Sequence, residues 1–201
     1  MATPPKVITL KKGVTTPIGT AMYPKLFRPD TKFDPDGKYS CDLIVDGEKA
    51  AALINEIDAL AGAFAKEIKK KAPGRPYAEV LDEEGNDTGQ YKFKASLKAT
   101  GKFGPRRPAV YDSKGKQLTT PVDAGNGTVM RMRVNVKGYN AGANAGITLE
   151  LVSVQIITLV EYGGNNGFEA VDGEGFVAEE REEKYEGMDA VETEDGEEGD
   201  Y

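Results

Sequence analysis

Two stretches of strict alternation between apolar and polar residues constrain the fold of this chain most. In YKFKASLK, residues 91–98, every second residue is Tyr, Phe, Ala or Leu. TVMRMRVNVK, residues 128–137, alternates in the same way between Met or Val and polar residues. Successive side chains of a β-strand point to opposite faces, so both stretches are predicted to be strands with one buried face. The other faces would carry Lys92, Lys94, Ser96 and Lys98, and Arg131, Arg133, Asn135 and Lys137.

The remaining patterns predict a mainly β fold with one helix. Period-two alternation continues in KYSCDLIV, residues 38–45, and long β-type segments extend to about residue 162. Apolar residues at steps of three and four predict a helix over about residues 46–71, which Pro73-Gly74 ends. Several strands with one helix in the first half favour a small β-barrel with that helix inserted between strands.

Charge divides the chain into two parts. Residues 179–201 hold 12 of its 33 acids but only 2 of its 26 bases, which leaves 21 acids and 24 bases before them. A net charge of +3 is thus followed by one of −10. We therefore predict a nucleic-acid-binding domain over residues 1–178 and a disordered acidic tail over 179–201, because the tail is too poor in apolar residues to fold alone.

The composition excludes several kinds of chemistry. The chain has no His and a single Cys, Cys41, so zinc sites and Cys–His nucleophile pairs cannot be built. The acids form no recognisable motif, and we expect no enzymatic activity, no metal and no cofactor. A lone Cys suits a reducing cytoplasm, and no apolar stretch is long enough to span a membrane.

The two basic strand faces are the candidate binding surface. Like charges side by side cost stability, whereas a phosphate backbone would offset their repulsion. Rings for base stacking would come from Tyr139, Tyr111 and the turn-rich run KFGPRRP. That run contributes Lys102, Phe103, Arg106 and Arg107. No phosphate-binding loop or base-reading helix is present, which favours single-stranded nucleic acid. A solvated, lysine-rich barrel exterior is the alternative interpretation.

Several motifs, taken together with their order along the sequence, show that the chain resembles the single-stranded-DNA-binding proteins of short-tailed bacteriophages. The resemblance rests on DGKYSCDLIV before a long helix, YKFKASLK, VYDSKGK at 110–116 and MRVNVKGYNAGANAGITLELVSVQIITLVEYGG at 132–164. It also rests on EGFVAEE before an acidic tail with a terminal aromatic.

The resemblance implies an OB-fold that coats single-stranded DNA without sequence preference. It implies strand annealing, dimerisation, and recruitment of phage DNA polymerase and primase-helicase during replication, recombination and repair in the cytoplasm of the infected bacterium. Lys92, Lys94 and Tyr139 match residues that contact DNA in the family. Two positions depart from its pattern. Tyr201 replaces a terminal Phe, and Asp36 replaces a basic residue, although Lys38 lies two residues further on.

The tail is predicted to compete with DNA for the basic groove and then to bind partner proteins. Its carboxylates would mimic phosphates, and the ring at its end would mimic a base. The tail residues concerned are Glu194, Asp195, Glu197, Glu198, Asp200 and Tyr201. Three alternatives remain at this stage: a tail that only maintains solubility, an acidic-tailed scaffold or chaperone, and an RNA-binding barrel.

Overall fold

The computed structural model describes residues 6–32, 34–69, 73–141 and 144–162, which form ten strands and one helix. The chain divides into a unit of Met1–Asn166 and a unit of Gly167–Tyr201, and all described residues belong to the first. In chain order the elements are β1 (Lys6–Thr15), β2 (Gly19–Asp30), β3 (Lys38–Asp46), α1 (Gly47–Ile68), β4 (Tyr77–Leu81), β5 (Asp87–Lys98), β6 (Thr100–Gly101), β7 (Gly104–Pro105), β8 (Ala109–Tyr111), β9 (Val129–Ala141) and β10 (Asn144–Thr158).

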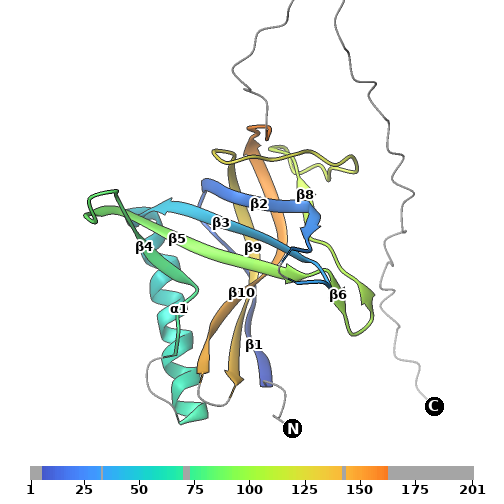
Figure 1. Ribbon diagram of the computed structural model, residues 1–201. Helices are drawn as coiled ribbons and strands as arrows, with labels where there is room; N and C mark the ends of the chain where they lie inside the picture. The colour runs from blue at the N-terminus through green and yellow to red at the C-terminus, as the bar shows by residue number, and fades with distance from the viewer. Residues whose placement is uncertain (1–5, 33, 70–72, 142–143, 163–201) are drawn as a thin grey trace, which may run out of the picture. The chain divides into compact units, whose positions relative to one another are not determined.

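Five strands close into a barrel. β9 pairs with β2, β2 with β3, β3 with β5, β5 with β10, and β10 pairs with β9 again (Figure 1). The β5–β10 pairing is parallel and short, whereas the other four are antiparallel. β1, β4 and β8 extend the sheet at β9, β5 and β10. A five-stranded barrel with extra strands is the OB-type architecture, so the prediction of an OB-fold-like barrel with one inserted helix is confirmed.

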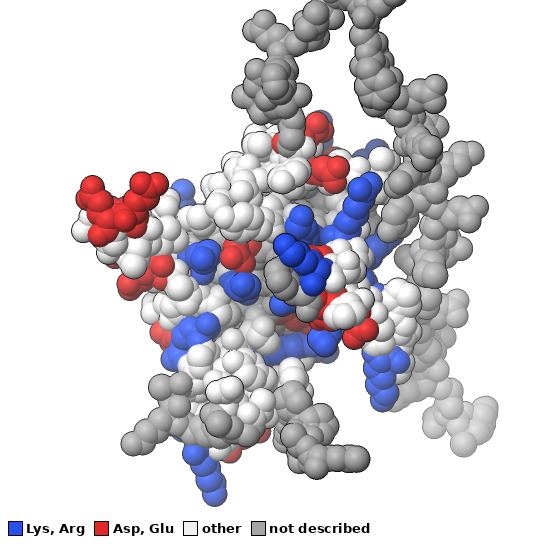
Figure 2. All heavy atoms as spheres, in the orientation of Figure 1, with Lys and Arg blue, Asp and Glu red and all other residues white. Residues whose placement is uncertain are grey.

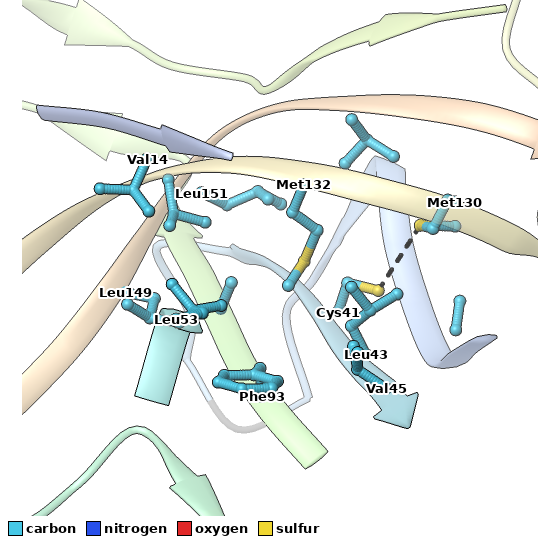
Figure 3. Packing of buried hydrophobic residues seen from close by; sticks show 14 of the residues in the cluster. Val14, Cys41, Leu43, Val45, Leu53, Phe93, Met130, Met132, Leu149 and Leu151 are labelled. Atoms are coloured by element: carbon cyan, nitrogen blue, oxygen red, sulfur yellow. Dashed lines mark hydrogen bonds between the residues drawn. The ribbon is translucent and has the colours of Figure 1, made fainter. Parts of the chain in front are cut away.

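The alternation of β5 and β9 sorts their side chains as predicted. Phe93 on β5 and Met132 on β9 are fully buried, and both lie in the barrel core that Figure 3 shows. Burying a side chain of this size stabilises the fold by about 1.5–3 kcal/mol. The lysines and arginines of the same two strands therefore have to point outward.

Cys41 on β3 belongs to the same core. Its Sγ lies 3.8 Å from Sδ of Met130 (Figure 3). Burial, and secondarily the charge of Asp42, raises the pKa of the Cys41 thiol to about 12. The thiolate is the reactive form of cysteine, so this side chain packs as an apolar group and is a poor nucleophile.

Helix α1 lies beside β4 and packs against the barrel (Figure 1). Asp46 begins the helix by accepting a hydrogen bond from the backbone N–H of Glu48 at 3.1 Å, and Lys69 ends it in a left-handed conformation. Phe64 lies directly over β9 at Gly138, where a Cβ would come within 2.8 Å of the ring. The absence of a side chain at Gly138 lets helix and strand pack this closely.

The helix spans Gly47–Ile68, within the predicted range, while β4 and β8 were not predicted. The polar run after Leu81 is a short turn, because β5 already begins at Asp87. The predicted boundary at residue 178 and the predicted tail lie outside the described residues. Among the described residues, no helix is long and apolar enough to cross a membrane.

Candidate nucleic-acid interface

A groove of about 340 Å³ on the outside of the barrel, called the first groove below, is lined by four of the predicted site residues. Lys38 comes from β3, Lys92 and Lys94 from β5, and Tyr139 from β9. Within the described part of the chain, these three lysines form no ion pair. The groove therefore presents unpaired cations beside a ring, which is the combination that single-stranded nucleic acid requires. Its other lining residues are Arg75, Pro76, Tyr77, Ala78, Ser96, Ile147 and Thr148.

The strand register brings these residues together. Lys94 faces Asp42 across the β3–β5 pair, and Lys38 faces Lys98. On the other side of β5, the parallel pairing with β10 sets Ser96 beside Glu150. Figure 2 shows Lys and Arg side chains over the middle of this face, along β5, with the largest acidic group over the β4–β5 turn.

β5 and β9 lie in the same sheet, but their basic outer faces are not adjacent to each other through β10 without an acid. β10 lies between the two strands and contributes Glu150 to the outer face. Glu150 Oε1 accepts hydrogen bonds from Lys137 Nζ at 2.5 Å and Arg106 Nη2 at 2.8 Å. Glu150 Oε2 accepts one from Asn135 Nδ2 at 3.2 Å. Two predicted DNA-binding cations, Lys137 and Arg106, are therefore already paired with a carboxylate.

Glu150 has a strongly lowered pKa. Its side chain is only 12% exposed, and this desolvation opposes ionisation, but the hydrogen bonds from Lys137, Arg106 and Asn135 outweigh it. Together they lower the pKa to about 2 from an ordinary value of 4.5. A lowered folded-state pKa contributes stability above the unfolded-state pKa, and that contribution is lost as the pH falls through the folded-state value.

We therefore expect Glu150→Gln to reduce the free energy of unfolding at pH 7 by about 1–3 kcal/mol. The difference from the wild-type protein should shrink between about pH 4.5 and pH 2, because the carboxylate of the unfolded wild-type chain binds a proton below about pH 4.5, whereas that of the folded chain does so only near pH 2. Urea denaturation of both proteins at pH 7 and pH 3 measures this difference in the free energy of unfolding. Glu79→Gln, at an exposed position of β4, is the control. An equal difference at both pH values would contradict the assigned ion pairs.

Arg75 and Tyr77, which were not predicted as site residues, also line the first groove. Arg75 Nε and the Tyr77 hydroxyl donate to Asp58 Oδ1 of α1 at 2.5 and 2.7 Å. Partial burial opposes ionisation of Asp58, but these two hydrogen bonds hold its pKa below the ordinary value. They tie α1 to the edge of the groove. The sequence signal for these two site residues is limited to the run GRPY, residues 74–77, which follows the helix.

The other predicted cations lie elsewhere on the surface. Arg133 lines a second groove, and Arg131 donates from Nε to Gln155 Oε1 at 2.8 Å. Lys98 is exposed at the end of β5 and lines none of the described grooves.

The run KFGPRRP, residues 102–108, forms the turn of the β6–β7 hairpin, β7 and the segment that follows β7. Phe103 is 95% exposed, with Lys102 Nζ 5.4 Å from the centre of its ring. Arg107 is exposed too. None of the described grooves includes Lys102, Phe103 or Arg107, so their part in binding stays a prediction.

Within the described residues, no three His, Cys, Asp or Glu side chains are grouped so that they could hold a metal ion. The described surface instead offers open grooves with cations and rings. A closed β-barrel with such grooves on its outer face defines a single-stranded nucleic-acid-binding barrel of the OB type.

The comparisons with known proteins agree with this class. The sequence model of the family described as "Enterobacter phage Enc34, ssDNA-binding protein" matches residues 12–186. The chain therefore belongs to this family of phage single-stranded-DNA-binding proteins. A comparison with curated proteins found no match.

Solved structures share the fold. The single-stranded DNA-binding protein gp2.5 of bacteriophage T7 has a TM-score of 0.60 at 24% identity, over 80% of this chain and 99% of that chain. The single-stranded DNA-binding protein of bacteriophage Enc34 has a TM-score of 0.58 at 20% identity, over 82% and 96%. The same protein in complex with ssDNA has a TM-score of 0.59 at 20% identity, over 75% and 88%.

Proposed function

We propose that this chain binds single-stranded DNA without sequence preference and that the first groove is the centre of the binding surface. The observation that carries the proposal is the convergence of Lys38, Lys92 and Lys94 beside Tyr139 on the outer face of the barrel. The lysines would bind phosphates, and the ring would stack on a base. Family membership and the solved Enc34 complex with ssDNA support this assignment.

The wider role follows from the family and the charge distribution. We propose that the protein coats and anneals single strands during phage DNA replication, recombination and repair in the cytoplasm of the infected bacterium. A dimer is the expected working form, and no catalytic activity is proposed. The acidic tail, residues 179–201, would recruit phage DNA polymerase and primase-helicase once DNA has displaced it from the groove.

The test compares single-stranded DNA, duplex DNA and RNA of equal length and related sequence. We expect single-stranded DNA to bind at least about tenfold more tightly than duplex, because bases in a duplex are not free to stack on Tyr139. Fluorescence anisotropy at several salt concentrations measures the affinities. Preference for duplex would reject the proposal, and equal or tighter binding of RNA would favour the RNA-binding alternative. Weak binding that does not depend on length would favour the scaffold alternative.

A further inference from the structure

A second groove of about 330 Å³ lies on the outer face of the barrel. It takes residues from four strands. The residues that matter are Lys12 and Gly13 of β1, Tyr111 of β8, Arg133 and Asn135 of β9, and Ser153 of β10. Like the first groove, it sets cations beside a tyrosine ring. Neither its charge nor its ring has a part in the function proposed above.

A bulge in β1 shapes this groove. The β1–β9 register shifts between Lys11 and Val14, and Gly13 inside the shift has a φ of +68°. The Gly13 N–H donates to Asn135 Oδ1 at 3.0 Å. A Cβ at Gly13 would lie 2.9 Å from Arg133 Nη2, so the glycine leaves room for the guanidinium to lie over the backbone.

Arg133 keeps its hydrogen-bond donors available. Its neighbours along the outer face of β9 are engaged, Arg131 by Gln155 and Lys137 by Glu150. Arg133, in contrast, forms no ion pair or side-chain hydrogen bond within the described ranges. An exposed guanidinium with free donors is a good ligand for a phosphate oxygen.

Tyr111 is held in place by the backbone around it. β8 pairs with β10 in parallel, with Tyr111 opposite Gln155. Gln155 Nε2 donates to the backbone oxygens of Asp112 and Ser113, both at 3.1 Å. The turn after Tyr111 is closed by Asp112 Oδ1, which accepts from the N–H of Lys114 and that of Lys116. Because these hydrogen bonds already order the backbone around Tyr111, little conformational entropy is lost when a base stacks on its ring.

The two grooves lie on either side of the cluster that Glu150 forms with Lys137 and Arg106, called the Glu150 cluster below. Glu150 is paired across β10–β5 with Ser96, which lines the first groove. It is paired across β10–β9 with Asn135, which lines the second. A nucleic-acid strand leaving the first groove toward β9 therefore passes the Glu150 cluster, where Lys137 and Arg106 neutralise the carboxylate.

We propose that the second groove is a further nucleotide subsite for the same DNA strand. Arg133 and Lys12 bind its phosphate, and Tyr111 stacks on its base. The subsite rests on the proposed function, since it extends the strand that the first groove binds. It also makes the binding site longer than the first groove alone, so that only oligonucleotides above a threshold length use it.

Tyr111→Trp tests this directly, because the natural chain contains no Trp and the new side chain is the sole indole reporter. We expect its emission to be quenched by oligothymidylate of about 16 nucleotides, but not by about 4 nucleotides, the span of site sizes known for OB-folds. Tyr162→Trp, at an 80% exposed tyrosine that lines a different groove, is the control and should not respond. An unchanged emission of the residue-111 indole at saturating long oligonucleotide would overturn the subsite.

Affinity measurements separate the subsite from general electrostatics. Tyr111→Ala or Arg133→Ala should weaken binding of the long oligonucleotide about tenfold and leave the short one unchanged. Tyr111→Phe, which keeps the ring, should bind like the wild type, and Lys49→Ala on α1 controls for loss of one charge. Equal losses at both lengths, or none, would reject the subsite. Failure of the wild-type chain to bind the long strand would instead reject the proposed function.

Discussion

Replacing Lys92 and Lys94 together by Ala is expected to weaken binding of single-stranded DNA about 10- to 30-fold at about 0.1 M salt. Both side chains are exposed in the first groove, and neither forms an ion pair within the part of the chain that the structure describes. Each phosphate contact releases a counterion. The plot of log affinity against log salt should therefore become shallower by up to about 0.7 for each lysine lost.

The loss should be the same for every base sequence, because a lysine–phosphate contact carries no sequence information. Titrations with oligothymidylate and with a mixed sequence at three salt concentrations measure both effects. Lys49→Ala with Lys66→Ala removes the same charge from exposed positions of α1 and should change the affinity little. A changed sequence preference, or an equal loss in the control, would show that the first groove is not the phosphate-binding site.

Deletion of residues 179–201 is expected to tighten single-stranded DNA binding about tenfold or more at low salt. These residues lie outside the described part of the chain, so the expectation rests on charge: the deleted segment holds twelve acids and two bases. If the tail occupies the basic groove in the free protein, its removal eliminates a competitor of DNA. Screening weakens such a competitor, and the gain should therefore fall as salt is raised.

Tyr201→Ala separates the charge of the tail from its terminal ring. This variant keeps every carboxylate, so its DNA affinity should stay close to that of the wild type, whereas its binding of the phage polymerase should fall. Equal DNA affinity of the full-length and truncated chains would contradict the competition. Equal recovery of polymerase by wild type and Tyr201→Ala would remove the proposed role of the ring.

Much of the fold could be predicted because the informative signals are local. Alternation assigns each residue of β5 and β9 to a face before any strand partner is known, so Phe93 was assigned to the core and Lys94 to the surface correctly. The helix signal that precedes β5 is equally local, and α1 lies within the expected range.

The composition of the site was less predictable because it depends on which strands are neighbours. From the sequence, Lys137 and Arg106 are cations available for DNA. In the structure, β10 places Glu150 between them, and both are engaged. Asp42 lies opposite Lys94 only through the register of β3 with β5. Strand order and register depend on contacts between segments far apart in the chain, and no local pattern reports them.

Short strands were missed for a related reason. β4 and β8 are too short to show a periodic pattern, and pairing with β5 and β10 makes them strands. Tyr77 on β4 lies at the edge of the first groove because Asp58 of α1 accepts a hydrogen bond from its hydroxyl. Tyr111 on β8 lies in the second groove because of the parallel pairing with β10.

The sequence by itself thus determined that this chain forms a β-barrel with one inserted helix, which of its residues face outward, and that its end is acidic. These properties follow from periodicity and composition, which each segment carries alone. Only the tertiary structure decided which outward cations are available to a DNA strand. It pairs Lys137 and Arg106 with Glu150 and collects Lys92, Lys94 and Tyr139 in one groove. The physical reason is that a cation binds phosphate only when no nearer carboxylate has neutralised it, and barrel closure decides which groups are near.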